Sequence, residues 1–168
     1  MEPYLKINYY FQNVYIKLTS DTFNSVASSN GDANMATVVA VGTSEGELEN
    51  KLTESVNMDG SLEKLVINDV SYGAGVAVKE GDTVTVHYKG TLTDGQVFDD
   101  SRVRSEPFTF TVGDGAVIQG WEEGILGMQV GGERILVIPG SMAYGNREVG
   151  IIPANATLLF AIELLSVE

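Results

Sequence analysis

Hydrophobic and polar residues alternate in short segments over the second half of the chain, and turn residues separate these segments. Residues 83–92 show the pattern most clearly, because Val84, Val86 and Tyr88 fall on one face of an extended chain and polar residues on the other. The Asp94-Gly95 pair that follows is a strong hairpin signal. An antiparallel sheet is therefore expected. The same pattern predicts strands at residues 65–67, 96–98, 107–112, 133–138 and 156–167, with a long loop at 141–153.

One segment, residues 113–130, has helical rather than alternating spacing. Its apolar residues recur at intervals of one, three, four and three, which places them on one face of a helix. Its glycines lower helix propensity but allow a close approach of the backbone to a neighbour. A helix this short is marginal by itself, so we expect it to lie across a curved sheet. These apolar residues are Val117, Ile118, Trp121, Ile125 and Met128.

Strands around one short helix predict an α+β fold, since a single helix covers only one face of a sheet. A pocket is expected between the helix, the sheet and the loop at 139–153, with Trp121 as its floor. Taken alone, Trp121 is more simply explained as a core residue. Glu122 and Glu123 at the start of the helix are expected only to favour its dipole. His87 is expected to be structural or partly exposed.

Residues 1–62 suggest no chemistry, and we expect them to be an extension or linker to a domain at residues 63–168. Within the extension, residues 14–18 alternate as a strand would. Residues 20–34 are rich in Ser, Asn and Asp and are expected to be a disordered linker. Met35 is a possible true start of the chain.

A short amphipathic helix is predicted at residues 44–60. The segment opens with Ser-Glu-Gly-Glu, a capping-box pattern, and Leu48, Leu52 and Val56 follow at spacings of four. Asp59 and Gly60 supply a stop. The helix could dock on the domain or be transient, and the tyrosines of the extension could mediate self-association.

Composition excludes several classes of site. The chain of 168 residues has no cysteine and one histidine, which excludes thiolate chemistry and argues against a histidine-built metal site or a Ser-His-Asp triad. The net charge of −13 argues against a nucleic-acid partner. Adjacent carboxylates at Asp99 and Asp100 point apart on an extended chain and do not predict a cation site. With no long apolar run and no legible signal peptide, a cytoplasmic protein without a membrane span is expected.

Eight short motifs occur in an order that carries a family resemblance. Together they resemble the FKBP-type (macrolide-binding) peptidyl-prolyl cis-trans isomerases over about residues 63–168. Any one of these motifs is weak evidence, and the ordered set is specific. The motifs are VHYKG at 86–90, DG at 94–95, FDDSR at 98–102, PFTF at 107–110, VIQGWEEG at 117–124, AYG at 143–145, GIIP at 150–153 and ATLLF at 156–160.

The resemblance implies an antiparallel half-barrel sheet wrapped around one short helix, with an aromatic pocket and no cofactor or metal. It implies that Trp121 lies beneath a proline ring and that the Ile118 N–H and the Tyr144 hydroxyl hold ligand carbonyls. Asp99 is expected to pair with Tyr88 or Arg104 rather than to act as a base. The expected catalytic positions are Tyr88, Phe98, Asp99, Trp121, Tyr144 and Phe160, and the expected substrate-binding positions are Arg104, Phe108, Val117, Ile118 and Ile152.

The function expected from this resemblance is isomerisation of X–Pro bonds in polypeptides by a monomeric protein that also binds rapamycin-type macrolides. An alternative is a non-catalytic module that binds proline peptides or macrolides as a scaffold or chaperone. The loop at 145–150 is about a residue shorter than in the best-known members and lacks their usual histidine, which affects sequence preference and macrolide affinity. No chaperone flap is inserted there.

Overall fold

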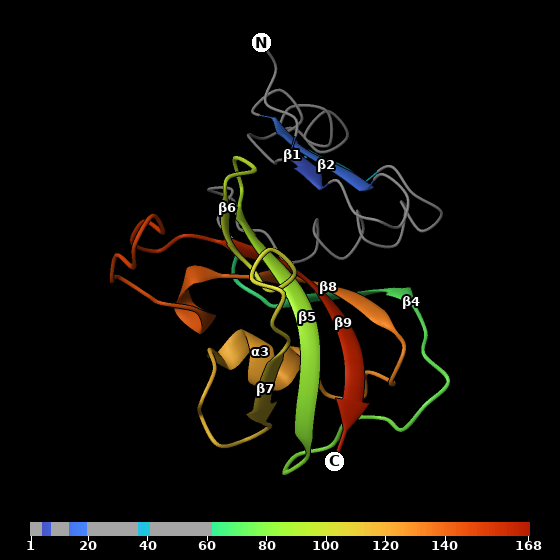
Figure 1. Ribbon diagram of the computed structural model, residues 1–168. Coiled ribbons are helices and arrows are strands. Elements are labelled where there is room, and N and C mark those ends of the chain that lie inside the picture. Colours follow the sequence, from blue (N-terminus) through green and yellow to red (C-terminus); the bar gives the residue numbers. More distant parts are fainter. Residues whose placement is uncertain (1–4, 8–13, 20–36, 41–61) are drawn as a thin grey trace.

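The computed structural model describes residues 62–168 and three strands of the preceding part (Figure 1). These strands are β1 (Leu5–Ile7), β2 (Val14–Thr19) and β3 (Thr37–Ala40), which pair antiparallel in that order. The strand predicted at residues 14–18 corresponds to β2. The linker predicted at 20–34 and the helix predicted at 44–60 lie outside the described residues.

Residues 62–168 form a six-stranded antiparallel sheet in which β4, β8, β9, β5 and β6 are neighbours in that order. The sixth strand of the sheet, β7, pairs with the first half of β5, and β6 pairs with the second half of β5. Both strands therefore use the same edge of β5. Figure 1 shows β5 and β9 side by side along the centre of the sheet. The strands are β4 (Val66–Ser71), β5 (Thr83–Leu92), β6 (Val97–Asp100), β7 (Phe108–Thr111), β8 (Glu133–Ile138) and β9 (Leu158–Val167).

The predicted α+β architecture is confirmed, with shifts at several strand ends. Strand β4 runs on to Ser71 because it pairs with β8 through Asp69 and Ser71. Strand β6 continues through Asp99 and Asp100, beyond the strand predicted at residues 96–98, because both residues pair with β5. Polar residues of low strand propensity are thus held in a strand by their partner.

The central helix is shorter than its apolar pattern, because α3 spans only Gln119–Gly124. Val117 and Ile118 precede it, and Ile118 caps it with an extended backbone at ψ 149°. A Cβ atom added at Gly120 would lie 2.4 Å from Cγ2 of Ile138, so only glycine allows this approach of α3 to β8. A Cβ at Gly124 would likewise lie 2.6 Å from Cδ1 of Leu136. The predicted close packing of helix on sheet is confirmed.

The turn before α3 is tied to the helix by Glu122. Its carboxylate accepts hydrogen bonds from the backbone N–H of Gly113 at 2.6 Å and of Gly115 at 3.0 Å. The sequence expectation that Glu122 only favours the helix dipole was therefore incomplete. Both glycines have positive φ, 94° and 68°, a conformation that favours glycine.

The end of α3 is held by a buried arginine of β8. The Arg134 guanidinium donates to the carbonyls of Gly124 and Leu126 at 2.8 and 2.9 Å and forms an ion pair with Asp69 of β4. A cation at the carboxyl end of a helix is favourable, and its charge is also paired. One side chain thus joins β4, β8 and α3.

The hydrophobic core lies between α3 and the face of the sheet that α3 covers. Its buried members come from every strand between β5 and β9 except β6, and from α3. They include Val84, Val86, Phe110, Trp121, Ile125, Leu136, Ile138, Leu158, Phe160, Ile162 and Leu164.

Candidate active site

A cavity of about 980 Å³ opens between α3, the concave face of the sheet and the loop before β9. Its lining comes from four strands, from α3 and the segment leading into it, and from two parts of the long loop. Ten of the eleven predicted site residues line it: Tyr88, Phe98, Asp99, Phe108, Val117, Ile118, Trp121, Tyr144, Ile152 and Phe160. The eleventh, Arg104, does not line the cavity and acts on it through Asp99.

The floor of this cavity is the indole of Trp121. Although the residue is only 3% exposed, the indole lines the cavity and is not sealed beneath other side chains. Tyr88 and Phe160 meet it edge-on, with ring centroids 5.1 and 5.2 Å away and interplanar angles of 87° and 88°. Phe108 completes the contact at 6.1 Å. Edge-to-face packing of this kind fixes each ring relative to the others.

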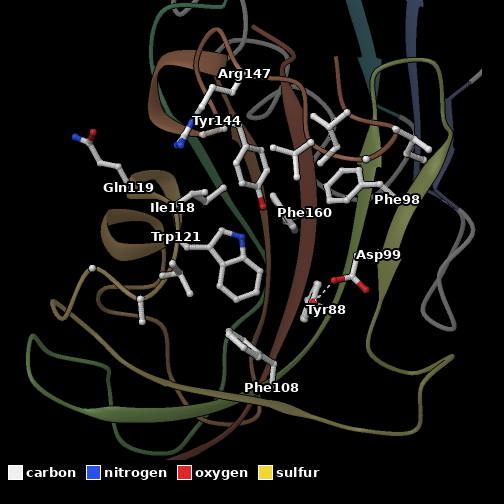
Figure 2. A pocket seen from close by; sticks show the side chains of 18 residues that line it. Tyr88, Phe98, Asp99, Phe108, Ile118, Gln119, Trp121, Tyr144, Arg147 and Phe160 are labelled. Atoms are coloured by element: carbon white, nitrogen blue, oxygen red, sulfur yellow. Dashed lines mark hydrogen bonds between the residues drawn. The ribbon is translucent and has the colours of Figure 1, made fainter. Parts of the chain in front are cut away.

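The floor carries one polar atom that has no partner among the described residues. The indole N–H of Trp121 has no hydrogen-bond partner in the part of the chain that the structure describes. Phe98 meets Phe160 edge-on at 5.5 Å and extends the aromatic wall toward β6. Figure 2 shows these rings gathered around one space, with the Tyr144 side chain reaching into it from the loop.

The polar wall of the cavity is built by Tyr88, Asp99 and Arg104. The Tyr88 hydroxyl donates to one carboxylate oxygen of Asp99, and the Arg104 guanidinium forms an ion pair with the other. Arg104 also donates to the Tyr88 hydroxyl oxygen at 3.1 Å and lies 5.7 Å from the centre of its ring. The predicted pairing of Asp99 is confirmed with both partners. Because both carboxylate oxygens of Asp99 are engaged in these contacts, the carboxylate holds the Tyr88 and Arg104 side chains in position.

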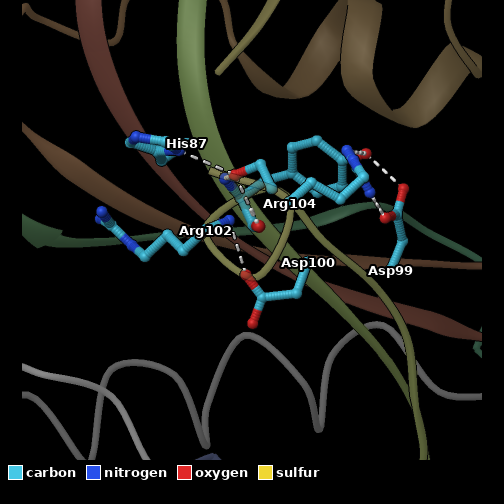
Figure 3. Close-up of polar contacts among 7 residues, drawn as sticks. His87, Asp99, Asp100, Arg102 and Arg104 are labelled. Carbon is cyan, nitrogen blue, oxygen red and sulfur yellow. Dashed lines mark hydrogen bonds and ion pairs between the residues drawn. The ribbon is translucent and has the colours of Figure 1, made fainter. Parts of the chain in front are cut away.

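Behind this wall, Ser101 holds the backbone of Tyr88 in place. Ser101 is fully buried, and its hydroxyl lies 2.9 Å from the Tyr88 nitrogen, 3.2 Å from the Tyr88 carbonyl oxygen and 2.9 Å from Nδ1 of His87 (Figure 3). His87 therefore packs behind the cavity, in agreement with its expected structural role. Sequence reasoning missed Ser101, which has no signal beyond its place beside Asp99 and Asp100.

The carboxylates of Asp99 and Asp100 serve different contacts. Asp100 accepts a hydrogen bond from the backbone N–H of Arg102 at 2.9 Å, within the turn that follows β6.

Among the described residues, no group of three or more His, Asp or Glu side chains is arranged to hold a metal ion. No helix in residues 62–168 has the length and apolarity that crossing a membrane requires.

The family follows from this geometry together with the sequence. A sequence model described as FKBP-type peptidyl-prolyl cis-trans isomerase matches residues 75–165, more than half of the chain. The chain belongs to this isomerase family. The match runs from the turn after β4 to residue 165, within β9, and so includes all eleven predicted site residues.

Relatives of the FKBP-type chain differ in how much of their length it covers. FK506-binding protein 1A of Neurospora crassa is 57% identical over 91 residues, which are 54% of this chain and 76% of that protein. The FKBP-type peptidyl-prolyl cis-trans isomerase FkpA of Escherichia coli is 42% identical over 154 residues, 91% of this chain and 56% of that protein. This chain therefore spans about half the length of the second relative.

Solved structures support the FKBP-type fold. The crystal structure of AtFKBP13 is 38% identical, with a TM-score of 0.59 over 68% of this chain and 98% of the other. The crystal structure of FkpA from Escherichia coli is 48% identical, with a TM-score of 0.58 over 67% of this chain and 50% of the other.

In this FKBP-type pocket, two hydrogen-bonding groups besides the Trp121 indole N–H are left without partners among the described residues. The backbone N–H of Ile118 has none, although its carbonyl accepts from the N–H groups of Trp121 and Glu122. The Tyr144 hydroxyl has none either, and Figure 2 shows it directed into the cavity. Both groups can therefore bind a ligand acceptor without breaking an existing hydrogen bond within the described part.

The cavity also includes residues that the sequence did not indicate. Gln119 comes from α3, and Arg147, Val149 and Ile151 come from the loop before β9. Gln119 and Ile151 lie within the motifs at 117–124 and 150–153 but were not predicted as site residues, and no motif contains Arg147 or Val149. Arg147 is the only side chain of this group that carries a charge.

Proposed function

We propose that this cavity binds an X–Pro segment of a polypeptide with the proline ring on Trp121 and accelerates rotation about the prolyl bond. The observation that carries the proposal is the aromatic cavity with an indole floor in a chain of the FKBP-type family. The uncatalysed barrier is about 18–20 kcal/mol because rotation breaks the C–N resonance. A catalyst needs only to bind the twisted amide better than the planar one.

An apolar wall supplies this preference. Twisting removes resonance and so reduces the charge separation between the amide oxygen and nitrogen. The twisted amide therefore loses less than the planar one when it leaves water for a cavity walled by aromatic rings. Phe98, Phe108, Trp121 and Phe160 provide these walls.

The unpartnered polar groups have a positioning role in this proposal. The Ile118 N–H and the Tyr144 hydroxyl donate to carbonyl oxygens next to the rotating bond. Binding energy outside the bond then orients the substrate, which lowers the entropic part of the barrier. Asp99 and Arg104 fix the Tyr88 ring and transfer no proton.

A comparison of variants tests this account. The rate of cis-trans exchange in an X–Pro tetrapeptide, measured by a protease-coupled assay or by NMR, is expected to fall more in Trp121→Leu and Phe98→Ala than in Asp99→Asn. Folding of each variant is checked by thermal unfolding. A result in which Asp99→Asn is the most damaging change would refute the apolar-cavity account.

The alternative function is a binding module without turnover. One relative is named for binding FK506 rather than for catalysis, and the same cavity would serve that role. The exchange assay, run with and without a rapamycin-like macrolide, separates the two. A wild-type chain that binds the macrolide but leaves the exchange rate at its uncatalysed value would support the alternative. Because one chain provides the whole cavity, we expect the monomer to be the active form.

A further inference from the structure

The two faces of the large sheet can be assigned from its register, because residues paired across antiparallel strands point to the same side. Leu136 of β8 pairs with Phe160, and Ile138 pairs with Leu158. Helix α3 packs on Leu136 and Ile138, so these residues define the concave face. Residues 135 and 137 of β8 therefore point to the opposite, convex face.

The convex face has an apolar centre. One row across the sheet consists of Val66, Val137, Leu159 and Thr91. The next row includes Ile135 of β8. We call Val66, Ile135, Val137 and Leu159 the convex patch.

The convex patch is buried, although it lies outside the main core. Its four side chains are 2–5% exposed, and none of them belongs to the core cluster around α3. Thr91 in the same row is 5% exposed. In a sheet with a helix on one side, the other face is normally solvated and polar. Burial of this degree therefore requires a cover on the convex side.

The turn after β6 reaches one end of this face. A third row consists of Glu133, Glu163 and His87. There Arg102 from the turn after β6 forms an ion pair with Glu163, and Figure 3 shows Arg102 and His87 on the same side of β5. This charged end lies two rows away from Val137 and Leu159, and none of the described contacts of Arg102 reaches these two residues.

We propose that residues 44–60 form an amphipathic helix that lies across the convex patch with Leu48, Leu52 and Val56 against it. The three side chains have the i, i+4, i+8 spacing of one helical face. The segment ends next to the patch in sequence, because Val66 is itself the first residue of β4.

The dimensions agree with this arrangement. Residues 61–65 can span up to roughly 20 Å at 3.3–3.6 Å per residue, which is enough for the chain to turn back over the sheet. A helix of this length extends about 26 Å. Four strands at about 4.8 Å spacing place the outermost axes about 14 Å apart, so one such helix crosses the whole row from Val66 to Thr91. Residues 44–61 would then be part of the folded domain rather than a linker.

A cysteine-labelling experiment tests the proposal on the full chain, which has no cysteine of its own. Leu159→Cys places a single thiol in the convex patch, and its maleimide labelling rate reports whether the patch is covered. A second substitution, Leu52→Asp, disrupts the apolar stripe. The matched control is Asn50→Asp, which adds the same charge on the opposite face of the helix. Exchange activity and Trp121 fluorescence confirm that the concave side stays folded.

The expected result is slow labelling of Leu159→Cys alone and with Asn50→Asp, and labelling at least about tenfold faster with Leu52→Asp, because the local cover opens. Fast labelling of Leu159→Cys alone would overturn the proposal, as would protection that Leu52→Asp does not change. Protection that depends on protein concentration would overturn it in favour of a second copy of the chain.

A cross-linking measurement keeps the test independent of variant stability. Under an oxidant, a disulfide is expected to join Leu52→Cys to Leu159→Cys within one chain, detected by mass, and not to form with Asn50→Cys in place of Leu52→Cys. Equal cross-linking of the two pairs would contradict the assigned face. Because this surface lies on the far side of the sheet from the cavity, its failure leaves the proposed isomerase function unaffected.

Discussion

Gly90 of β5 sits where two walls of the cavity meet, and Gly90→Ala is predicted to impair catalysis more than folding. An added Cβ would lie 2.5 Å from Cε2 and Cζ of Phe98 and 2.9 Å from Cε1 of Phe160. Carbon atoms in good contact are about 3.5–4.0 Å apart, so each ring must retreat by up to about 1 Å. Gly90 does not have a positive φ, so the backbone itself tolerates alanine.

The size of the effect follows from the position of these rings. Overpacking by one methyl group costs about 1–3 kcal/mol of folding free energy. A displacement of about 1 Å in a site that depends on positioning can reduce turnover by about a hundredfold. We therefore expect kcat/KM of Gly90→Ala to fall by at least about tenfold while the chain remains folded.

Gly75→Ala is the matched control for this change. Its Cβ would lie 2.6 Å from Cβ of Val130, an equally tight contact, and neither residue lines the cavity. Both variants are compared by thermal unfolding and by the tetrapeptide exchange assay. If Gly90→Ala and Gly75→Ala lose similar stability and both keep kcat/KM within twofold of the wild type, the positions of Phe98 and Phe160 do not control turnover.

Three further predictions follow from single side chains. Arg134→Met leaves Asp69 and the carbonyls of Gly124 and Leu126 without their partner and is expected to cost about 3–5 kcal/mol in urea unfolding; a loss below 1 kcal/mol would contradict this. Burial and the nearby Glu163 charge raise the pKa of Glu133 above its ordinary 4.5, while the Arg102 charge acts to lower it. The ionised Glu133 carboxylate therefore destabilises the fold as the pH rises through the raised pKa. Glu133→Gln should therefore stabilise the protein at pH 7 by up to about 1 kcal/mol, with the gain vanishing below the ordinary pKa; a gain that persists in thermal unfolding at low pH would contradict the assignment. Arg147 lines the cavity with no ion-pair partner among the described residues, so Arg147→Glu should lower kcat/KM for peptides with Glu beside the proline, relative to Lys, several-fold; an unchanged ratio would exclude this contact.

The elements that the sequence predicted best are those in which the pattern itself is the cause of the structure. Strands β5 and β8 have the predicted bounds, because their alternating or continuous apolar residues are what the two faces of the sheet bury. The glycines at 120 and 124 also predicted the close approach of α3, which the contacts with Ile138 and Leu136 explain.

What the sequence could not predict depends on contacts between distant segments. The apolar face of residues 113–130 suggested a longer helix, but Val117 and Ile118 are bent into the cavity wall. Arg134 and Ser101 are polar residues whose burial is justified only by partners elsewhere in the fold, such as Asp69 and Tyr88. No local pattern encodes such a partner.

The family motifs identified most of the cavity because they are the residues that must meet there, and the structure adds the reason the cavity stays open. An apolar hollow of this size would tend to collapse if its walls could move. Here Tyr88 is fixed from behind by Ser101 and in front by Asp99. Trp121 is held edge-on by its ring neighbours and sits on a helix that glycines bring against β8. Polar contacts therefore lie around the cavity and keep it rigid, so that its interior can remain apolar and ready for a twisted prolyl bond.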